Sequence, residues 1–206
     1  MRRALSLWIL LSGCAGPGPS APGAVDLLAL VDPARDAVEG RWSRDGGALV
    51  TANAAFARIQ IPQVPPEEYD VRLVAERTEG SNSIVLGLVR EGRPFMVAID
   101  AMIGKEEIPR SGVELIDGRS FPENETLVVG RQLTNGKRTT IGVSVRRTGV
   151  AVTVEGRKII DWKAGDSRLG LHVKWKMPRR DGLWLGAFAC VYRVYELTLV
   201  PATGAP

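Results

Sequence analysis

The feature that most constrains the fold is an alternation of apolar and polar residues that recurs along most of the chain. One example is the segment Tyr69–Arg77, in which mostly charged residues occupy every second position. Its residues Val71, Leu73 and Ala75 share the opposite face. This period of two is typical of a half-buried β-strand, because successive side chains of a strand point to opposite faces. No long stretch has a helical period, so the chain is predicted to be all-β.

Turn residues separate the alternating segments and predict how the strands are joined. Glu79–Asn82 supplies turn residues between Tyr69–Arg77 and Ser83–Arg90, so these two strands are predicted to pair as a hairpin. Glu91–Pro94 turns the chain again before Phe95–Asp100. The three strands are therefore expected to form a meander.

The same pattern continues to the end of the chain. Asn135-Gly136 is a strong hairpin signal, because both residues tolerate positive φ. Residues 101–111 break the rhythm and are expected to form a loop with at most one helical turn. About a dozen strands are predicted, and the others are Ala48–Thr51, Phe56–Ile61, Gly112–Ile116, Arg138–Arg147, Val150–Glu155, Lys158–Trp162, Leu169–Trp175, Leu183–Phe188 and Val191–Val200. Many short strands with polar turns predict a sandwich of two antiparallel sheets rather than βαβ units.

Residues 1–13 have the layout of an export signal. Two arginines precede an apolar run from Ala4 to Leu11, and small residues follow it. The run is too short to span a bilayer as a helix, which needs about 20 apolar residues. One interpretation is an ordinary secretory signal that is cut at a later small residue, Ala15 or Ala24.

The tetrapeptide Leu11–Cys14 (LSGC) favours a second interpretation, because it resembles the lipobox of bacterial lipoproteins. The resemblance implies that the thiol of Cys14 and the new amino terminus are acylated. Acyl chains anchor a protein to a membrane, because each methylene group buried in the bilayer contributes about 0.8 kcal/mol to the free energy of binding. Residues 14–24 then form a Pro/Gly-rich tether, 25–200 one domain and 201–206 a tail. Ala15 in place of aspartate after the cysteine favours the outer membrane of the cell envelope.

The charge distribution argues against a nucleic-acid partner. The chain has 27 Lys and Arg against 23 Asp and Glu, and removal of the signal leaves 25 basic residues and a net charge of about +2. Basic and acidic residues are interleaved, and the clusters Lys137-Arg138, Arg146-Arg147 and Arg179-Arg180 are expected at solvated turns and edge strands. Paired arginines can also grip a sulfate or carboxylate, so an anionic glycan is an alternative partner.

Cys190 has no disulfide partner if Cys14 is acylated. It lies in the apolar, aromatic segment Phe188–Tyr192, so we predict a small buried hydrophobic residue there. An exported domain without a disulfide must depend on its hydrophobic core for stability.

The order of several short motifs resembles concanavalin-like jelly rolls and, more narrowly, the 3-keto-disaccharide hydrolase-type domain found in planctomycete-like bacteria. These motifs are Asp26–Leu30 with Gly40–Trp42 and Gly47–Val50, then Glu68–Leu73 with Gly80–Ser83, then Gly112–Asp117, and finally Val152–Gly156. Each motif alone is common in hairpins, and their order carries the resemblance across most of residues 25–200. The resemblance implies a jelly-roll sandwich whose concave face commonly meets carbohydrate, as an enzyme in some members and as a binding module in others.

The carboxylates do not show the spacing of an ordinary glycoside hydrolase. Hydrolysis usually needs two carboxyl groups on one face, about 5–5.5 Å or 6.5–9.5 Å apart. Glu114 and Asp117 are expected on opposite faces of one strand. Glu76 shares a face with Arg72, so the simpler interpretation of Glu76 is a cross-strand ion pair. Glu76 and Glu114 are therefore catalytic candidates only if a partner comes from another strand.

His172 is the single histidine of the chain, which excludes sites with several histidines. No spacing typical of zinc or EF-hand calcium ligands appears, so no metal site and no cofactor is predicted, and a structural calcium ion is left open. In the strand predicted for Leu169–Trp175, His172 alternates away from the apolar face. It is a catalytic candidate, and a partly buried, hydrogen-bonded histidine is the simpler interpretation.

Tryptophans are the main candidates for sugar contacts, because the C–H faces of sugar rings stack on indole. The candidate sugar-binding residues are Trp184, Trp162, Trp42, Arg72 and Glu76. Trp184 is favoured, because it alternates away from Leu183 and Leu185, whereas Trp175 is expected in the core. Burial in the core is the competing interpretation for every tryptophan.

The sequence as a whole predicts a monomeric, lipid-anchored jelly-roll domain that binds a carbohydrate of the cell envelope or the environment. One alternative is a glycoside hydrolase acting on 3-keto-disaccharides or related sugars. Another is a structural or protein-interaction lipoprotein without a sugar ligand. A groove that holds tryptophan beside arginine and aspartate would favour sugar binding, converging carboxylates would favour the enzyme, and a filled concave face would favour the structural role.

Overall fold

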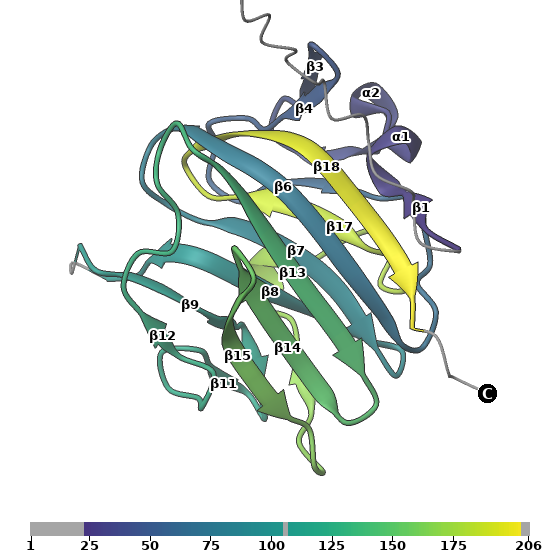
Figure 1. The fold of residues 1–206 in the computed structure, drawn as a ribbon, viewed down its shortest axis with the longest axis vertical. Helices are drawn as coiled ribbons and strands as arrows, with labels where there is room; N and C mark the ends of the chain where they lie inside the picture. Colours follow the sequence, from purple (N-terminus) through teal and green to yellow (C-terminus); the bar gives the residue numbers. More distant parts are fainter. Residues whose placement is uncertain (1–22, 105–106, 203–206) are drawn as a thin grey trace, which may run out of the picture.

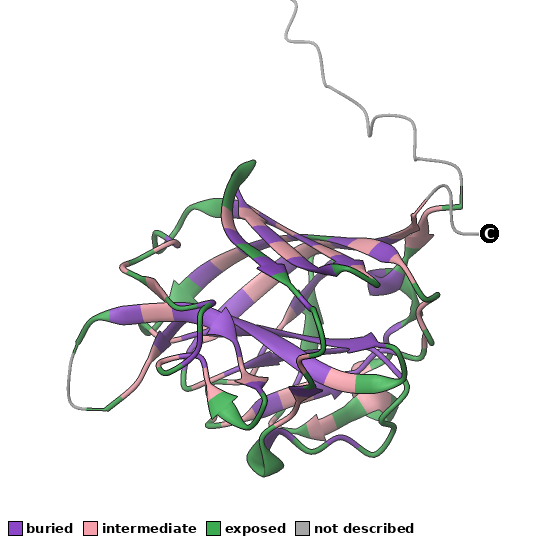
Figure 2. Cartoon of the chain, turned by 90° about the horizontal axis from the view of Figure 1, so that it is seen from below, coloured by how far each residue is buried: buried purple, intermediate pink, exposed green. Residues whose placement is uncertain are grey.

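The computed structural model describes residues 23–104 and 107–202, and it confirms the predicted all-β sandwich. Two antiparallel sheets lie one over the other, as Figure 2 shows from the side. The predicted export signal, Cys14 and most of the predicted tether lie outside the described residues. In the described part of the chain, no helix combines the length and the apolar character needed to cross a bilayer.

The first sheet, sheet A, lies at the front of Figure 1. Its strands in spatial order are β15 (Arg157–Lys163), β14 (Gly149–Val154), β13 (Arg138–Arg146), β6 (Tyr69–Glu79), β18 (Val191–Pro201), β4 (Ala48–Val50) and β3 (Ser43–Asp45). The short strand β1 (Val25–Asp26) pairs with β18, so the beginning and the end of the domain are hydrogen-bonded to each other. Two four-residue helices, α1 (Leu27–Leu30) and α2 (Pro33–Asp36), follow β1.

The second sheet, sheet B, lies behind sheet A in Figure 1. Its strands in spatial order are β12 (Val128–Val129), β9 (Pro109–Val113), β8 (Arg93–Met102), β7 (Ile84–Arg90), β17 (Trp184–Ala187), β5 (Ala57–Gln60) and β2 (Ala37–Glu39). A small third sheet joins β11 (Arg119–Ser120), β10 (Leu115–Ile116) and β16 (Leu169–Gly170).

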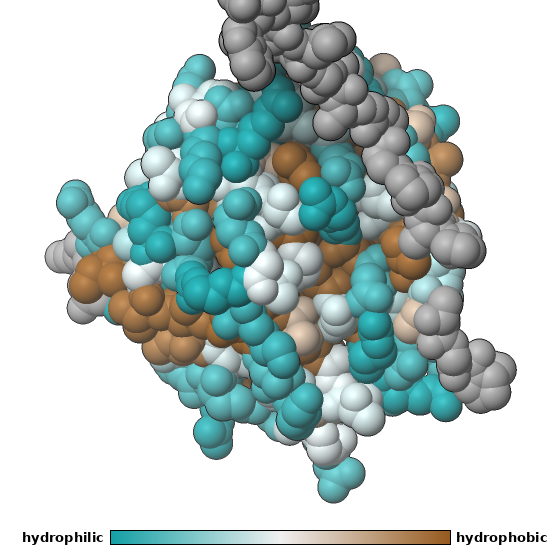
Figure 3. Space-filling model, viewed as in Figure 1, coloured by the Kyte–Doolittle hydropathy of each residue, from teal (hydrophilic) through white to brown (hydrophobic). Residues whose placement is uncertain are grey.

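The main core lies between the two sheets and follows the alternation of the sequence. In β6, the residues Val71, Leu73 and Ala75 point inward and are buried, whereas Arg72 is exposed on the outer face of sheet A. Cys190 is fully buried in the same core, as predicted from its apolar neighbours. The outer face of sheet A mixes hydrophilic side chains with smaller pale and apolar areas in Figure 3.

Sheet B is buried on both faces, which distinguishes it from sheet A. All seven residues of β7 are buried, although only every second one points into the main core. The others, such as Val85, belong to a second apolar layer on the outer face of sheet B. Residues 171–177 cover this layer, and they include the 3-10 helix η1 (Val173–Trp175). A strand buried on both faces reads as a continuous apolar run, and residues 84–89 are such a run.

Two tight turns adopt the conformations that their residues predict. Glu91-Gly92 joins β7 to β8, and Glu155-Gly156 joins β14 to β15, with positive φ at both residues of each turn. This geometry matches the twist of the paired strands in a two-residue hairpin. The predicted pairing of Ser83–Arg90 with Phe95–Asp100 is confirmed, because β7 pairs with β8.

The hairpin predicted for Tyr69–Arg77 and Ser83–Arg90 is wrong. The first segment is β6 of sheet A and pairs with β13 and β18, whereas the second is β7 of sheet B. The turn at Gly80–Asn82 thus carries the chain from one sheet to the other. The Asn135-Gly136 turn likewise joins β12 of sheet B to β13 of sheet A. Turn residues indicate that the chain reverses direction, but they do not specify with which strand the next one pairs.

Two further segments differ from the prediction. Strand β8 extends to Met102 and β9 begins at Pro109, so both ends of the loop expected at residues 101–111 are strand. The strand predicted for Leu169–Trp175 ends after Gly170, and η1 follows. The backbone N–H groups of Trp175 and Lys176 bond to the carbonyls of His172 and Val173, which turns the segment back over sheet B.

Candidate functional site

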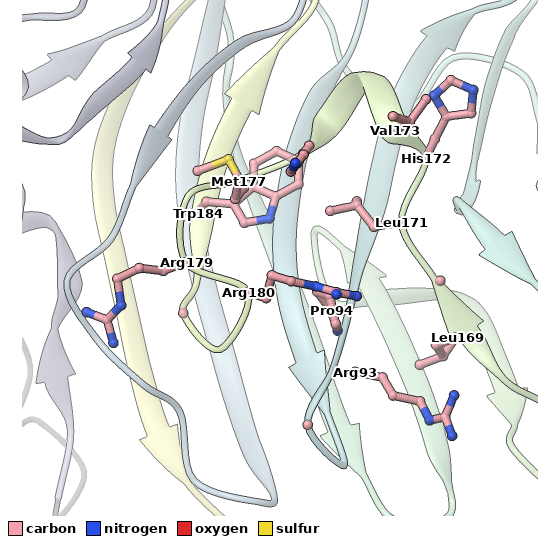
Figure 4. Close-up of a pocket in the computed structure, with 14 residues that line it drawn as sticks. Arg93, Pro94, Leu169, Leu171, His172, Val173, Met177, Arg179, Arg180 and Trp184 are labelled. Carbon is pink, nitrogen blue, oxygen red and sulfur yellow. The ribbon is translucent and has the colours of Figure 1, made fainter.

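A cavity with a volume of about 400 Å³ lies on the outer face of sheet B. Its walls come from three parts of the chain that the fold brings together. They are the start of β8, strand β16 with the segment that follows it, and Gly182 with Trp184 at the start of β17. Figure 4 shows these segments around one space. A cavity of this size accommodates a small organic ligand.

The apolar part of the cavity is formed by a few large side chains. Pro94 and Leu171 are half-buried, and Met177 is buried beneath the loop that carries it. These carbon surfaces can pack against the C–H face of a sugar ring. The segment that covers sheet B therefore shapes the cavity. The alternation of the sequence had instead predicted a strand for this segment.

Trp184 lies at this cavity, but its side chain is not an exposed stacking platform. The prediction that it points away from Leu183 and Leu185 is confirmed, because those residues lie in the main core and Trp184 lies in the outer layer. The expected exposure is wrong, since only 1% of Trp184 is accessible. Trp175 stacks on its ring at a centroid distance of 5.6 Å. Trp184 therefore supports the cavity from below.

The polar rim of the cavity is basic. Four of its lining residues carry a positive charge, namely Arg93, Lys176, Arg179 and Arg180. Among the lining residues that the structure describes, none is Asp or Glu. The predicted solvation of Arg179-Arg180 is confirmed, because both residues are exposed. The sequence analysis did not single out Arg93 or Lys176, because neither is directly adjacent to another basic residue.

His172 also lines the cavity, at the start of η1. The interpretation that it is partly buried is wrong, because the chain leaves the strand conformation before it and the side chain is exposed. Its Nδ1 accepts a hydrogen bond from the backbone N–H of Lys174 at 3.2 Å. In the neutral ring this bond places the proton on Nε2, which can then donate to a ligand.

The other two candidate tryptophans are core residues and do not contact this cavity. Trp162 is 3% exposed, and its Nε1 donates a hydrogen bond to Glu125 at 2.7 Å. Trp42 is 5% exposed, and its Nε1 donates to the carbonyl of Glu39. Both rings pack in the main core, where aromatic burial dominates. Neither residue therefore offers an exposed surface on which a sugar ring could stack, which corrects the prediction made for them.

Arg72 and Glu76 lie on the outer face of sheet A, the sheet opposite to the cavity. Arg72 bonds to Glu196 at 2.8 Å, and Glu76 accepts a hydrogen bond from the hydroxyl of Tyr195 at 2.7 Å. The expected pair between Arg72 and Glu76 is thus replaced by two pairs with the neighbouring strand β18. Neither residue contributes to the cavity on sheet B.

Glu114 lines a second, smaller cavity on the outer face of sheet B, with a volume of about 160 Å³. It follows β9 directly and is half-buried beside apolar side chains such as Phe121. This burial raises the pKa of the Glu114 carboxyl. No second acid is among the described residues that line this cavity, so it offers one carboxyl and not a pair.

A third hollow contains two carboxylates, those of Glu125 and Asp161. Glu125 holds the indole of Trp162, and Asp161 accepts hydrogen bonds from Lys163 at 2.9 Å and Lys158 at 3.1 Å. These hydrogen bonds lower the pKa of Asp161. Both carboxylates of this hollow are thus bound by neighbouring side chains of the protein.

The described residues contain no group of three or more His, Cys, Asp or Glu side chains placed to hold a metal ion. The candidate catalytic residues are also dispersed. His172 is at the basic cavity, Glu114 is at the smaller cavity, and Glu76 is on the other sheet. The structure therefore does not bring the predicted catalytic residues together.

No family model and no curated protein sequence matches the chain, whereas solved structures do. The carbohydrate-binding module CBM66 from Bacillus subtilis has a TM-score of 0.53 and 10% identity, and the match covers 79% of this chain and 92% of that one. A Bacillus subtilis protein with a galectin-like fold has a TM-score of 0.59 and 12% identity, over 86% and 94%. The apo Crh5 transglycosylase has a TM-score of 0.59 and 10% identity, over 88% and 85%.

These similarities extend over most of this chain and most of each neighbour. At about a tenth of identical residues they establish the fold, which is a galectin-like or concanavalin-like jelly roll. They leave the narrower assignment to the 3-keto-disaccharide hydrolase-type domain as a prediction. The chain is a jelly-roll sandwich whose structural neighbours include a carbohydrate-binding module.

Proposed function

We propose that this protein binds carbohydrate in the basic cavity on the outer face of sheet B. The observation that carries the proposal is the cavity itself, which combines apolar walls at Pro94 and Leu171 with positively charged and hydrogen-bonding side chains. Ligand sites commonly combine a largely apolar lining with a few placed polar groups. The similarity of the fold to a carbohydrate-binding module supports the same conclusion.

The proposal is tested by screening the full chain, purified in detergent, against an array of neutral and acidic oligosaccharides. Binding to at least one defined oligosaccharide is expected, and Leu171→Asp should abolish it because a carboxylate would occupy the apolar wall. The matched control is Val74→Asp, a substitution of a half-buried apolar residue on the outer face of sheet A. An array without signal, or equal loss in both variants, would contradict the proposal.

A second proposed function is hydrolysis of 3-keto-glycosides, and one observation favours it. The half-buried carboxyl of Glu114 has a raised pKa, which is a property of general acids. A 3-keto-sugar is activated next to its carbonyl, so a single acid or base could suffice in place of a carboxylate pair. Release of a free sugar from a 3-keto-disaccharide, and its loss in Glu114→Gln, is the result that this function requires.

We also propose that Cys14 carries lipid and that the domain is held at the cell envelope, most simply at the outer membrane. The support is the sequence of residues 1–24, in which an export signal, a lipobox-like tetrapeptide and a Pro/Gly-rich tether follow one another. Under this proposal, the cavity presents a carbohydrate-binding surface at a membrane.

A further inference from the structure

We propose that the ligand of the basic cavity is an anionic saccharide, and that Arg93 and Arg180 bind its carboxylate or sulfate group. This inference rests on the proposed carbohydrate binding and specifies the class of sugar. It requires a local excess of positive charge, cationic groups without protein partners, and an apolar surface beside them. All three are found at this cavity.

The positive charge of the cavity is not a reflection of overall composition. Without the two arginines of the signal, the chain has almost equal numbers of basic and acidic residues. The described residues that line the cavity include three arginines and one lysine but no carboxylate. A segregation of this kind creates a positive potential that attracts anions.

Several arginines elsewhere in the domain have a carboxylate partner. On sheet A, Arg72 pairs with Glu196, Arg146 with Asp70 through two hydrogen bonds, and Arg193 with Asp45. In each of these pairs the guanidinium group is already bound by the protein itself.

Arg93 and Arg180 have no such partner among the described residues, although both are exposed and line the cavity. Arg179, by contrast, lies 3.4 Å from Asp181 and turns to the other side of the loop in Figure 4. Arg180 extends across the space in front of Pro94 in the same view. The two free guanidinium groups therefore remain available to a ligand.

The chemistry of these groups selects the ligand class. A guanidinium group forms two parallel hydrogen bonds with a carboxylate, sulfate or other planar or tetrahedral oxyanion. The adjacent carbon surfaces of Pro94 and Leu171 would be left without contact by a small inorganic anion. A sugar ring that carries an acidic substituent uses both parts of the cavity at once.

The inference is tested by titration calorimetry on the full chain in detergent with two matched pairs of oligosaccharides. One pair is an oligogalacturonate and the same oligosaccharide with its carboxylates reduced to alcohols. The other is a sulfated oligosaccharide and its desulfated form, so the two pairs distinguish the carboxylate from the sulfate. Inorganic sulfate alone is the fifth ligand.

At least one acidic member is expected to bind about tenfold or more tightly than its neutral partner, because a charge-assisted hydrogen bond contributes enough binding free energy for a change in affinity of this size. Arg93→Gln and Arg180→Gln should each lower this affinity about tenfold, and the preference should weaken as salt is raised. Arg72→Gln, on the opposite sheet, should leave binding unchanged. All three arginines are exposed, so these variants should keep the melting temperature of the parent.

Several results would overturn the inference. Neutral sugars that bind as tightly as acidic ones would refute the ligand class while carbohydrate binding stands. An acidic preference that survives both cavity substitutions would refute the site. Inorganic sulfate that binds as tightly as the sulfated sugar would show that the ring contributes nothing. If none of these saccharides binds while the array gives a signal, the inference fails and carbohydrate binding stands; if the array is silent as well, the proposed function itself fails.

Discussion

The guanidinium group of Arg77 and the carboxylate of Asp100 lie 3.3 Å apart in the interior, and neither side chain has exposed surface. Arg77 belongs to β6 of sheet A and Asp100 to β8 of sheet B, so the pair joins the two sheets. The Asp100 carboxylate also accepts hydrogen bonds from the backbone N–H groups of Gln132 at 2.6 Å and Leu133 at 3.1 Å. These contacts compensate for much of the cost of burying two charges.

Replacement of Arg77 by methionine should therefore destabilise the domain strongly. The substitution leaves the buried carboxylate of Asp100 without its main counter-charge, and the expected loss is about 3–5 kcal/mol in the free energy of unfolding. Urea denaturation measures this loss. Arg72→Met is the matched control on the same strand, and it should cost less than about 1 kcal/mol because its ion pair is exposed to solvent. Similar losses in the two variants would contradict the role of the buried pair.

Glu114→Gln should change the pH dependence of stability. Burial raises the pKa of Glu114 in the folded state, so the folded protein binds the proton more tightly than the unfolded chain. The penalty for ionising Glu114 is absent below the ordinary glutamate pKa of 4.5 and grows as the pH rises through the folded-state pKa. The glutamine variant should thus gain stability relative to wild type between acidic and neutral pH. Unfolding curves that stay parallel across this range would refute the prediction.

Gly87→Ala should disturb the floor of the cavity. A Cβ atom at Gly87 would lie 1.9 Å from Nε1 of Trp184, so the indole must move. Overpacking of this kind costs about 1–3 kcal/mol and should alter the tryptophan fluorescence of the folded protein. Gly170→Ala is the control, because its Cβ would make ordinary contacts of 3.5 and 3.7 Å with Leu115. Equal melting temperatures for the two variants would argue against this packing.

Cys190 should be unreactive in the folded protein. Its side chain is fully buried, and burial raises the pKa of the thiol to about 11, so little thiolate exists at neutral pH. In a Cys14→Ser chain, Cys190 is the remaining thiol, and its modification by a thiol reagent should be slow until urea unfolds the domain. Rapid modification without denaturant would mean that this part of the core opens readily.

Cys14→Ser should release the protein from membranes without changing its melting temperature. Position 14 lies outside the described domain, and the substitution removes the thiol that would carry the acyl chains. Fractionation of cells that express each form measures the distribution. A serine variant that still sediments with membranes at high salt would contradict the lipid anchor.

The alternation of the sequence predicted the two-sheet fold because it reports which face of each strand is buried. It placed Leu183 and Leu185 in the main core and Trp184 on the opposite face, all of which is confirmed. It could not reveal that another segment covers that opposite face, because Leu169–Trp175 has the same alternation as a strand.

The cavity arginines escaped prediction for a related reason. Arg93 begins β8, whereas Arg180 lies far along the chain in the loop before β17. Nothing local marks Arg93, and the two segments come together only because β7 pairs with β8 on one side and with β17 on the other. The one available signal was the doublet Arg179-Arg180, which indicated an anionic partner without locating the rest of the site.

The pairing of β1 with β18 has a mechanical consequence. Tension on the segment that precedes Gly23 reaches the domain first at β1, which holds to β18 through only two residue pairs. Strand β18 itself is bonded to β6 along most of its length. Under load, β1 can therefore separate from β18 and extend the segment that precedes the domain, while the sandwich and its cavity stay intact.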